Sequence, residues 1–425
     1  MRVGAAIAAL SLLAAGCASA TAAQLPKTAQ LLKTAQPATT AQLPKTAQPA
    51  KAAAQADARP YGAADTAFGL NLLGAWCRQD PRQNLLLSPA SMATALGMAY
   101  LGAKGPTARA MAKALRLPAT VSLAGLEART RALTSLNGPG VTLDQSNQVW
   151  ADPSLPTNKS YLNALAAGYR AGVTRVPLLT DPGQAAQRID RAVSAATKGQ
   201  IRHLVNPGML HGLGWLLTSA LYLDATWATE FQVGQTYAQQ FTTASGQRVN
   251  PEFLHGSGYQ IGRAGGWTGV TLPYRGGKVK LVALLPSASA ADSCAMPGTS
   301  TLAAVTGNGH GGQGSIAMPK VALNSSGDFE DLLSSLGMGI AFGPAADFTG
   351  ISPKAAAIGL VQQDATLRVS EKGTVAAAAT GVGVTTGAIP APRNVITFNR
   401  PYLMLITTVT GEPLFLVRVV NPMDG

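Results

Sequence analysis

The chain has 425 residues, of which 47% are hydrophobic and 12% charged, a composition that indicates a large globular core and excludes a disordered chain. The formal net charge is +13, but the basic residues are scattered, without a dense basic helix or an aromatic platform. This distribution favours a merely basic, solvated surface over nucleic-acid binding, with a weak affinity for glycans or anionic surfaces as the alternative. No apolar run after the N-terminus is long enough for a transmembrane helix.

Residues 1–20 are typical of a secretory signal, because Arg2 precedes an apolar stretch that extends to Ala15. Two processing sites are compatible with this leader. Residues 14–17 (Ala-Ala-Gly-Cys) resemble a bacterial lipobox and would place a lipid on Cys17, whereas residues 18–20 (Ala-Ser-Ala) fit ordinary signal cleavage. Both interpretations predict export.

A repeat follows the leader, since AQLPKTAQ occurs at 23–30 and again at 41–48. A Pro-punctuated repeat rich in Ala, Gln, Thr and Lys cannot bury a core and predicts a flexible spacer over 21–60. A spacer suits a domain that is held away from a membrane, so it favours the lipid anchor on Cys17. We therefore predict an extracellular or cell-surface lipoprotein with one folded domain over 61–425.

Two further cysteines lie in this domain, Cys77 at the end of a helical pattern and Cys294 in a Ser/Ala-rich stretch. An exported pair can form a disulfide, but two cysteines do not make a disulfide framework. We expect two separate thiols, with Cys77 buried. The chain has no zinc-like Cys/His spacing, so no metal and no cofactor are predicted.

Helical and strand-like patterns alternate along the domain and predict an α+β fold. Residues 287–314, rich in Gly, Ser and Ala, give no prediction. Helices are expected at 64–77, 91–102, 161–169 and 182–196, and strands at 84–87, 141–150, 172–176, 215–223 and within 267–286.

Several separated segments of the chain, in the same order, resemble the serpins, a family of protease inhibitors. They are NLLLSPASMATALGMAYLGAKGPTARAMAKAL at 84–115, the apolar strand that leads to Trp227, Met-Pro-Lys at 318–320, Ala-Asp-Phe-Thr-Gly-Ile at 346–351, Phe-Asn-Arg-Pro-Tyr-Leu at 398–403 and Val-Arg-Val-Val-Asn-Pro at 417–422. The resemblance covers 64–425 except 287–314. It implies the serpin fold, with a large mixed central β-sheet, smaller sheets, eight or nine helices and an exposed reactive-centre loop at about 371–392.

The resemblance also implies a mechanism. A serpin offers its loop as bait, the protease forms a covalent acyl-enzyme, and the cleaved loop then inserts into the central sheet and traps the protease. Insertion requires small side chains, and residues 371–380 read Glu-Lys-Gly-Thr-Val-Ala-Ala-Ala-Ala-Thr. Strand alternation would bury every second residue, and the buried ones, Thr374, Ala376, Ala378 and Thr380, are neither large nor charged. The predicted hinge residues are Glu371, Gly373, Thr374, Ala376, Ala377, Ala378, Ala379 and Thr380.

The bond to be cut is placed by two spacings. Counting from Glu371 gives Gly387–Ala388, and counting back from Phe398 gives Thr386–Gly387; Val384 and Thr385 precede both. These residues are small and neutral, and no Arg or Lys lies between Lys372 and Arg393. The loop therefore favours an elastase-like or subtilisin-like serine endopeptidase over a trypsin-like one, with cysteine proteases that accept small residues as an alternative.

The resemblance assigns structural roles to five more residues. Ser88 and Ser91 match the shutter, where the central sheet parts, and Trp227 matches the breach, where insertion begins. Gln363 and Ser219 stand where the family often has His and Asn, and both can still satisfy buried polar groups. We therefore expect an altered but intact shutter.

Two other functions are less consistent with the sequence. A non-inhibitory serpin that acts as a binding or chaperone-like protein often has Pro or bulky charged residues in its hinge, and 373–380 have none. An enzyme would need a catalytic motif, yet the histidines lie outside HExxH and the chain has no GxSxG or SxxK. The sequence predicts a monomeric inhibitor whose partner is its target endopeptidase.

Overall fold

The computed structural model describes residues 57–288, 294–307, 312–374 and 394–424. Eight α-helices lie in this part of the chain, and α8 continues directly into a helical turn, η4 (Ser334–Met338). The helices are α1 (Arg59–Gln79), α2 (Pro89–Tyr100), α3 (Gly105–Ala114), α4 (Leu123–Thr134), α5 (Lys159–Tyr169), α6 (Pro182–Ala196), α7 (Thr299–Thr306) and α8 (Glu330–Leu333).

Local sequence explains where several helices begin. Ser88 accepts a hydrogen bond from the Ser91 backbone N–H, and proline follows it in the first turn of α2. Asp181 accepts from the Gln184 N–H at the start of α6, again with proline in the first turn. Both arrangements satisfy N–H groups that have no partner inside the helix.

The central sheet has six strands in the order β12-β13-β14-β4-β2-β3. It is mixed, because β2 and β3 are parallel while the other pairs are antiparallel. The strands are β12 (Val321–Asp328), β13 (Gln362–Val369), β14 (Gly373–Thr374), β4 (Trp215–Thr226), β2 (Val141–Ala151) and β3 (Gly172–Arg175).

The second large sheet has nine strands, and every residue of β16 and β17 in it is buried. Its order is β1 (Leu85–Leu87), β17 (Pro413–Val419), β16 (Tyr402–Thr408), β10 (Val279–Pro286), β9 (Trp267–Pro273), β8 (Glu252–Ala264), β11 (Gln313–Pro319) and β15 (Val395–Thr397), with β5 (Tyr237–Ala238) also paired to β8. A two-stranded hairpin, β6 (Phe241–Thr242) with β7 (Arg248–Val249), completes the strands.

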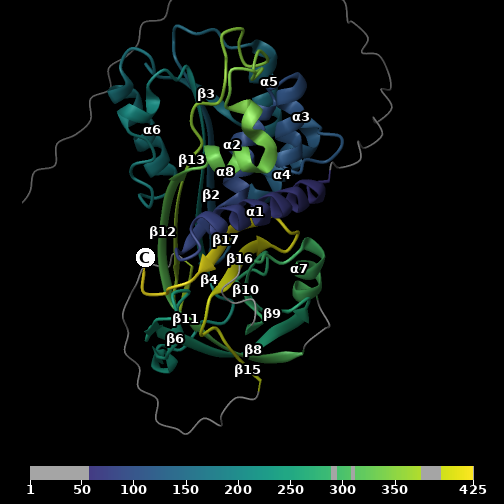
Figure 1. Ribbon diagram of the computed structural model, residues 1–425, viewed down its shortest axis with the longest axis vertical. Helices are drawn as coiled ribbons and strands as arrows, with labels where there is room; N and C mark the ends of the chain where they lie inside the picture. Colours follow the sequence, from purple (N-terminus) through teal and green to yellow (C-terminus); the bar gives the residue numbers. More distant parts are fainter. Residues whose placement is uncertain (1–56, 289–293, 308–311, 375–393, 425) are drawn as a thin grey trace, which may run out of the picture. The chain divides into compact units, whose positions relative to one another are not determined.

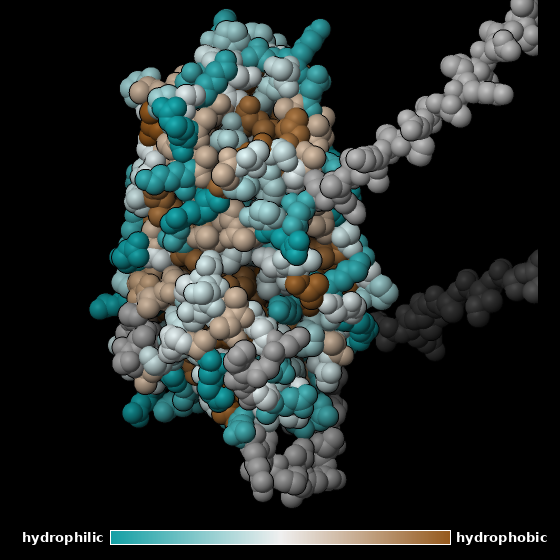
Figure 2. Space-filling view, turned by 90° about the vertical axis from the view of Figure 1, so that its right-hand side faces the viewer, coloured by the Kyte–Doolittle hydropathy of each residue, from teal (hydrophilic) through white to brown (hydrophobic). Residues whose placement is uncertain are grey.

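Helices from separate parts of the chain pack on the central sheet. Helix α2 packs on β4, and α6 packs on β2 and β4. In Figure 1, α2 to α5 and α8 gather around the upper half of the domain, whereas β8, β9, β10 and α7 lie below α1. Figure 2 shows small, separate hydrophobic patches among hydrophilic residues on one face. No helix among the described residues is long and apolar enough to cross a membrane.

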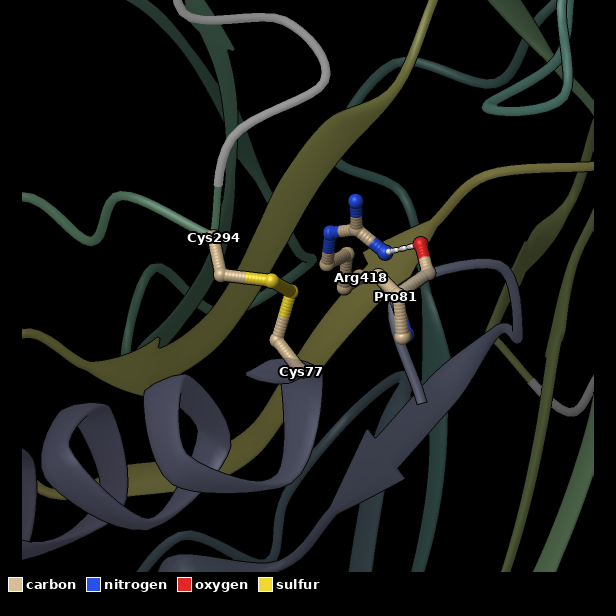
Figure 3. Close-up of a disulfide and its surroundings, with 4 residues drawn as sticks. All are labelled: Cys77, Pro81, Cys294 and Arg418. Atoms are coloured by element: carbon tan, nitrogen blue, oxygen red, sulfur yellow. Dashed lines mark hydrogen bonds between the residues drawn. A yellow bond between two sulfur atoms is a disulfide. The ribbon is translucent and has the colours of Figure 1, made fainter. Parts of the chain in front are cut away.

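Cys77 and Cys294 form a disulfide, so the expectation of two separate thiols is wrong. Cys77 is buried at the end of α1, and its Cα lies 5.6 Å from that of Cys294, within the range that a disulfide requires. Figure 3 shows this bond beside a hydrogen bond from Arg418 to the carbonyl oxygen of Pro81. The cysteines are 217 residues apart, and only the folded chain brings them together.

Candidate functional site

The candidate site is the place where the chain after β13 turns back into the central sheet. Strand β13 ends at Val369, and Gly373 and Thr374 then pair antiparallel with Thr226 and Ala225 of β4. Thr374 also pairs with Val369. Gly373 and Thr374, two of the predicted hinge residues, thus already form a short strand, β14, between β4 and β13.

A cavity of about 190 Å³ lies between the remaining lengths of these two strands. Its walls come from β4 at 215–220 and from the chain that enters β13 at 354–363, and α2 and the end of α6 close it. Among the described residues, no backbone ladder joins β4 directly to β13. The sheet is thus paired through β14 at one end and open along its centre.

Gly373 is required by a close backbone approach. A Cβ atom at this position would lie 2.0 Å from the carbonyl oxygen of Ala225, well inside any tolerated contact. The absent side chain therefore lets the hinge lie against β4. The sequence predicted a flexible hinge here, and the structure adds this steric reason.

Thr374 faces the core, as strand alternation predicted, and is 0% exposed. Its hydroxyl shares a hydrogen bond of 2.5 Å with the Tyr274 hydroxyl. Burial raises the pKa of Tyr274, with a smaller opposing effect of this hydrogen bond, so the phenol stays neutral. One of the two buried hydroxyls donates and the other accepts, so each has a hydrogen-bond partner.

Trp227 holds the turn that precedes the hinge. Its indole N–H donates to the carbonyl oxygen of Ser370 at 2.8 Å, and its backbone N–H donates to that of Lys372 at 2.9 Å. The ring stacks on Tyr274 with centroids 4.4 Å apart. Trp227, which the resemblance assigned to the breach, thus contacts both the turn before the hinge and Tyr274, the partner of Thr374.

Glu371 anchors the same turn through charge. Its carboxylate lies 3.2 Å from the ammonium of Lys320, which also binds Glu252 at 2.9 Å. Burial opposes ionisation of Glu371, but a backbone N–H and Lys320 outweigh it and hold the pKa of this carboxyl below its usual value. The backbone N–H of Phe231 donates to the Glu371 carbonyl oxygen as well.

The four residues assigned to the shutter lie at the junction of α2 with the central sheet. The Gln363 side chain accepts from the Ser88 N–H and donates to the Ser88 carbonyl oxygen, both at 3.0 Å. The Ser88 hydroxyl donates to the Leu414 carbonyl oxygen at 2.8 Å.

The other two shutter residues form a separate group. The Ser91 hydroxyl donates to the Ser219 carbonyl oxygen, and the Ser219 hydroxyl donates to the side chain of Asn147 at 3.0 Å. Gln363 and Ser219 thus satisfy different partners. The role of this altered shutter stays a prediction.

Sequence reasoning missed Tyr274, Lys320 and Asn147. They come from β9–β10, β11–β12 and β2, and only the tertiary register brings them to the hinge or the shutter. Lys320 lies in the Met-Pro-Lys motif at 318–320, but the sequence carries no local signal for the contacts that any of the three residues makes. Other predicted residues lie outside the described part of the chain: Cys17, Ala376, Ala377, Ala378, Ala379, Thr380, Val384, Thr385, Thr386, Gly387 and Ala388.

Comparison with known proteins bears on this arrangement. The family model described as serpin (serine protease inhibitor) matches residues 63–422. An uncharacterised serpin-like protein of Thermococcus kodakarensis is 29% identical over 80% of this chain and 82% of its own length. The leukocyte elastase inhibitor of Bos taurus is 26% identical over 85% of this chain and 99% of its own.

Among solved structures, a highly specific serpin of the insect Tenebrio molitor superposes with a TM-score of 0.72 at 23% identity. The match covers 85% of this chain and 98% of that one. At this identity the likeness concerns the fold. It confirms the predicted α+β architecture with its mixed central sheet.

Proposed function

The chain belongs to the serpin (serine protease inhibitor) family, and from this premise we propose that it traps its target protease covalently by inserting its own cleaved loop between β4 and β13. The family indicates an inhibitor and not an enzyme. The observation that carries the proposal is β14. Because Gly373 and Thr374 are already paired with β4, the residues that follow them have a strand to continue. The cavity of about 190 Å³ lies along that line.

The chemistry of trapping begins as ordinary peptide hydrolysis. The protease nucleophile attacks the carbonyl carbon of the scissile bond, the amide bond breaks, and a proton passes to the new amino terminus. The loop upstream stays joined to the protease as an acyl group. Insertion of that loop then moves the protease away and prevents deacylation.

Side-chain size supports the insertion step. After Thr374, the alternate positions that would enter the core are Ala376, Ala378 and Thr380. The cavity walls are formed by β4, α2 and α6 and are largely apolar, which suits small side chains and would reject large or charged ones. Strand pairing and burial that the intact loop cannot reach would supply the driving free energy.

The target class follows from the loop sequence. Val384 to Ala388 are small and neutral, so they fit the shallow primary pockets of elastase-like or subtilisin-like endopeptidases. The inhibitor would act as a monomer and without a cofactor. Each molecule would be consumed by one protease.

Export is proposed with a lipid on Cys17. The leader and the spacer support it, and so does the Cys77–Cys294 disulfide, because such bonds persist in oxidising compartments outside the cytosol. Mass spectrometry of the mature protein tests the anchor. A diacylated N-terminal Cys17 is expected, and a free N-terminus after Ala20 would contradict it.

A mixing experiment tests the inhibitory function. We expect the chain, incubated with elastase or subtilisin, to give a band at the summed mass that survives boiling in detergent. Sequencing the released C-terminal peptide would identify the scissile bond. If every protease that cuts within 384–388 cleaved the chain and none gave such a band, the result would contradict trapping.

A further inference from the structure

A second pocket, away from the hinge, lies against the disulfide. It measures about 410 Å³ and is bounded by α1, α3, the segment from Cys294 to Met296 and η4. This volume falls in the range of sites that hold small organic molecules. None of the residues around β14 lines it.

The floor of this pocket is apolar. Leu70 of α1 and Ala114 of α3 are each only 5% exposed, and Met296 and Leu336 pack against the same core. Cys294 forms part of the wall and is held by its bond to Cys77. A ligand body that rests here would therefore cover hydrocarbon and sulfur.

Among the described residues that line the pocket, the rim carries positive charge and no carboxylate. Arg78 of α1, Lys113 of α3 and Arg116 just beyond α3 all line the pocket and are all exposed. Within the described residues, none of the three has an ion pair or a side-chain hydrogen bond. Three cations that share one opening favour an anionic group among them.

Two backbone features lie beside this pocket. Gly74 lies one helical turn before Arg78, and a Cβ atom there would lie 3.3 Å from Met296 Cγ and 3.7 Å from Arg78 Nη1. The Arg78 guanidinium thus lies over Gly74, beside the Met296 wall. Arg116 has a positive φ of 56° just beyond the end of α3, a position that favours glycine. A glycine there would leave the pocket without the Arg116 guanidinium.

We propose that this pocket binds an amphipathic organic anion, whose acidic head lies among Arg78, Lys113 and Arg116 and whose apolar part covers Leu70, Met296 and Leu336. The described residues of the hinge and of β14 do not line this pocket, so binding can be tested independently of protease trapping. Because the disulfide fixes one wall, its reduction should weaken binding. Binding should also raise the unfolding midpoint by mass action.

Calorimetric titration of the oxidised chain with sodium octanoate, 1-octanol and sodium acetate tests the proposal. We expect one saturable octanoate site per chain, with octanol and acetate each weaker by about tenfold or more, because each lacks one half of the recognised chemistry. Octanol binding as tightly as octanoate would reduce the site to an apolar cleft. Acetate binding as tightly would reduce it to an adventitious ion site.

Variants locate the site. The double substitution Lys113→Met, Arg116→Met should weaken octanoate binding by about tenfold or more, while the midpoint without ligand stays close to that of the parent chain. Arg109→Met is the matched control, since Arg109 is exposed on the same helix but does not line the pocket. An equal loss in the control, or no loss in the double variant, would overturn the proposal.

Discussion

Asp65 on α1 is buried beside one other acidic group, Glu412, and one basic group, Arg129. Its carboxylate pairs with Arg129 of α4 at 2.5 Å, and Arg129 also donates to Thr94 and to the Ala90 carbonyl oxygen in α2. Glu412, between β16 and β17, is 0% exposed. Burial raises the pKa of Asp65 to about 6, Arg129 opposes this rise, and Glu412 adds to it.

This raised pKa predicts that acid stabilises the fold at this position. In the unfolded chain the pKa of this carboxyl is about 3.9. Between about pH 4 and 6 the folded state therefore binds the proton more strongly than the unfolded state does. The contribution of Asp65 to the free energy of unfolding is therefore present at low pH and is lost as the pH rises through about 6. We expect Asp65 to contribute about 2 kcal/mol more to the free energy of unfolding at pH 4.5 than at 7.5.

Urea unfolding of the parent chain and of Asp65→Asn at the two pH values measures this effect, because titrating groups that do not interact with Asp65 cancel in the comparison. The difference in stability between parent and variant should shift in favour of the parent on acidification. A difference that does not change with pH would contradict the raised pKa.

Gly373 predicts a second effect at the scale of one residue. In Gly373→Val the new side chain would collide with the Ala225 carbonyl oxygen, so the hinge could no longer lie between β4 and β13. We expect the variant to be cleaved as a substrate, with several inhibitor molecules consumed for each protease trapped. Titration of residual protease activity measures this ratio.

Lys372→Ala is the matched control for that variant, because the Lys372 side chain is exposed and only its backbone contacts Trp227. The control should trap as the parent does. If Gly373→Val trapped with the parent's ratio, the hinge contact would have no role in insertion.

At the scale of elements, the disulfide joins the end of α1 to the segment before α7 and closes a loop of 217 residues. Long closed loops restrict the unfolded chain most. We expect Cys77→Ser, Cys294→Ser to lower the free energy of unfolding by about 2 to 5 kcal/mol, measured by urea unfolding against the oxidised parent.

Neither cysteine lines the cavity between β4 and β13. The double serine variant should therefore still form the detergent-stable complex at a temperature where it is folded. Loss of trapping in a folded variant would show that the disulfide acts on insertion and not only on stability.

Elements with regular apolar spacing could be predicted from the sequence. Helix α6 has the predicted bounds, and β2 extends one residue beyond its predicted end. Residues 287–314 gave no prediction, although they contain α7. That helix is fixed by packing, because its Val305 lies where Gly262 of β8 and Gly269 of β9 leave room, and local propensity does not record such contacts.

The site was predicted only in part, for a related reason. Family motifs placed Gly373, Thr374 and Trp227, whereas Tyr274 and Lys320 are brought to the hinge by strands far away in the sequence. The cysteine pairing was predicted wrongly for the same cause. A contact between distant segments depends on the whole fold and leaves no trace in either segment alone.

At the scale of the whole molecule, the central sheet is closed by β14 at one end and open along its middle. A strand in that opening would add two backbone ladders and bury apolar side chains. We therefore predict that the intact fold is less stable than the cleaved and inserted one, and that a kinetic barrier holds the intact fold.

The thermal unfolding midpoint of the intact chain, compared with that of the chain cleaved within 384–388, tests this claim most directly. We predict a large rise on cleavage in the parent and in Lys372→Ala, and little or no rise in Gly373→Val. Equal midpoints for the intact and cleaved parent would show that the loop does not enter the sheet, and would contradict the inhibitory mechanism.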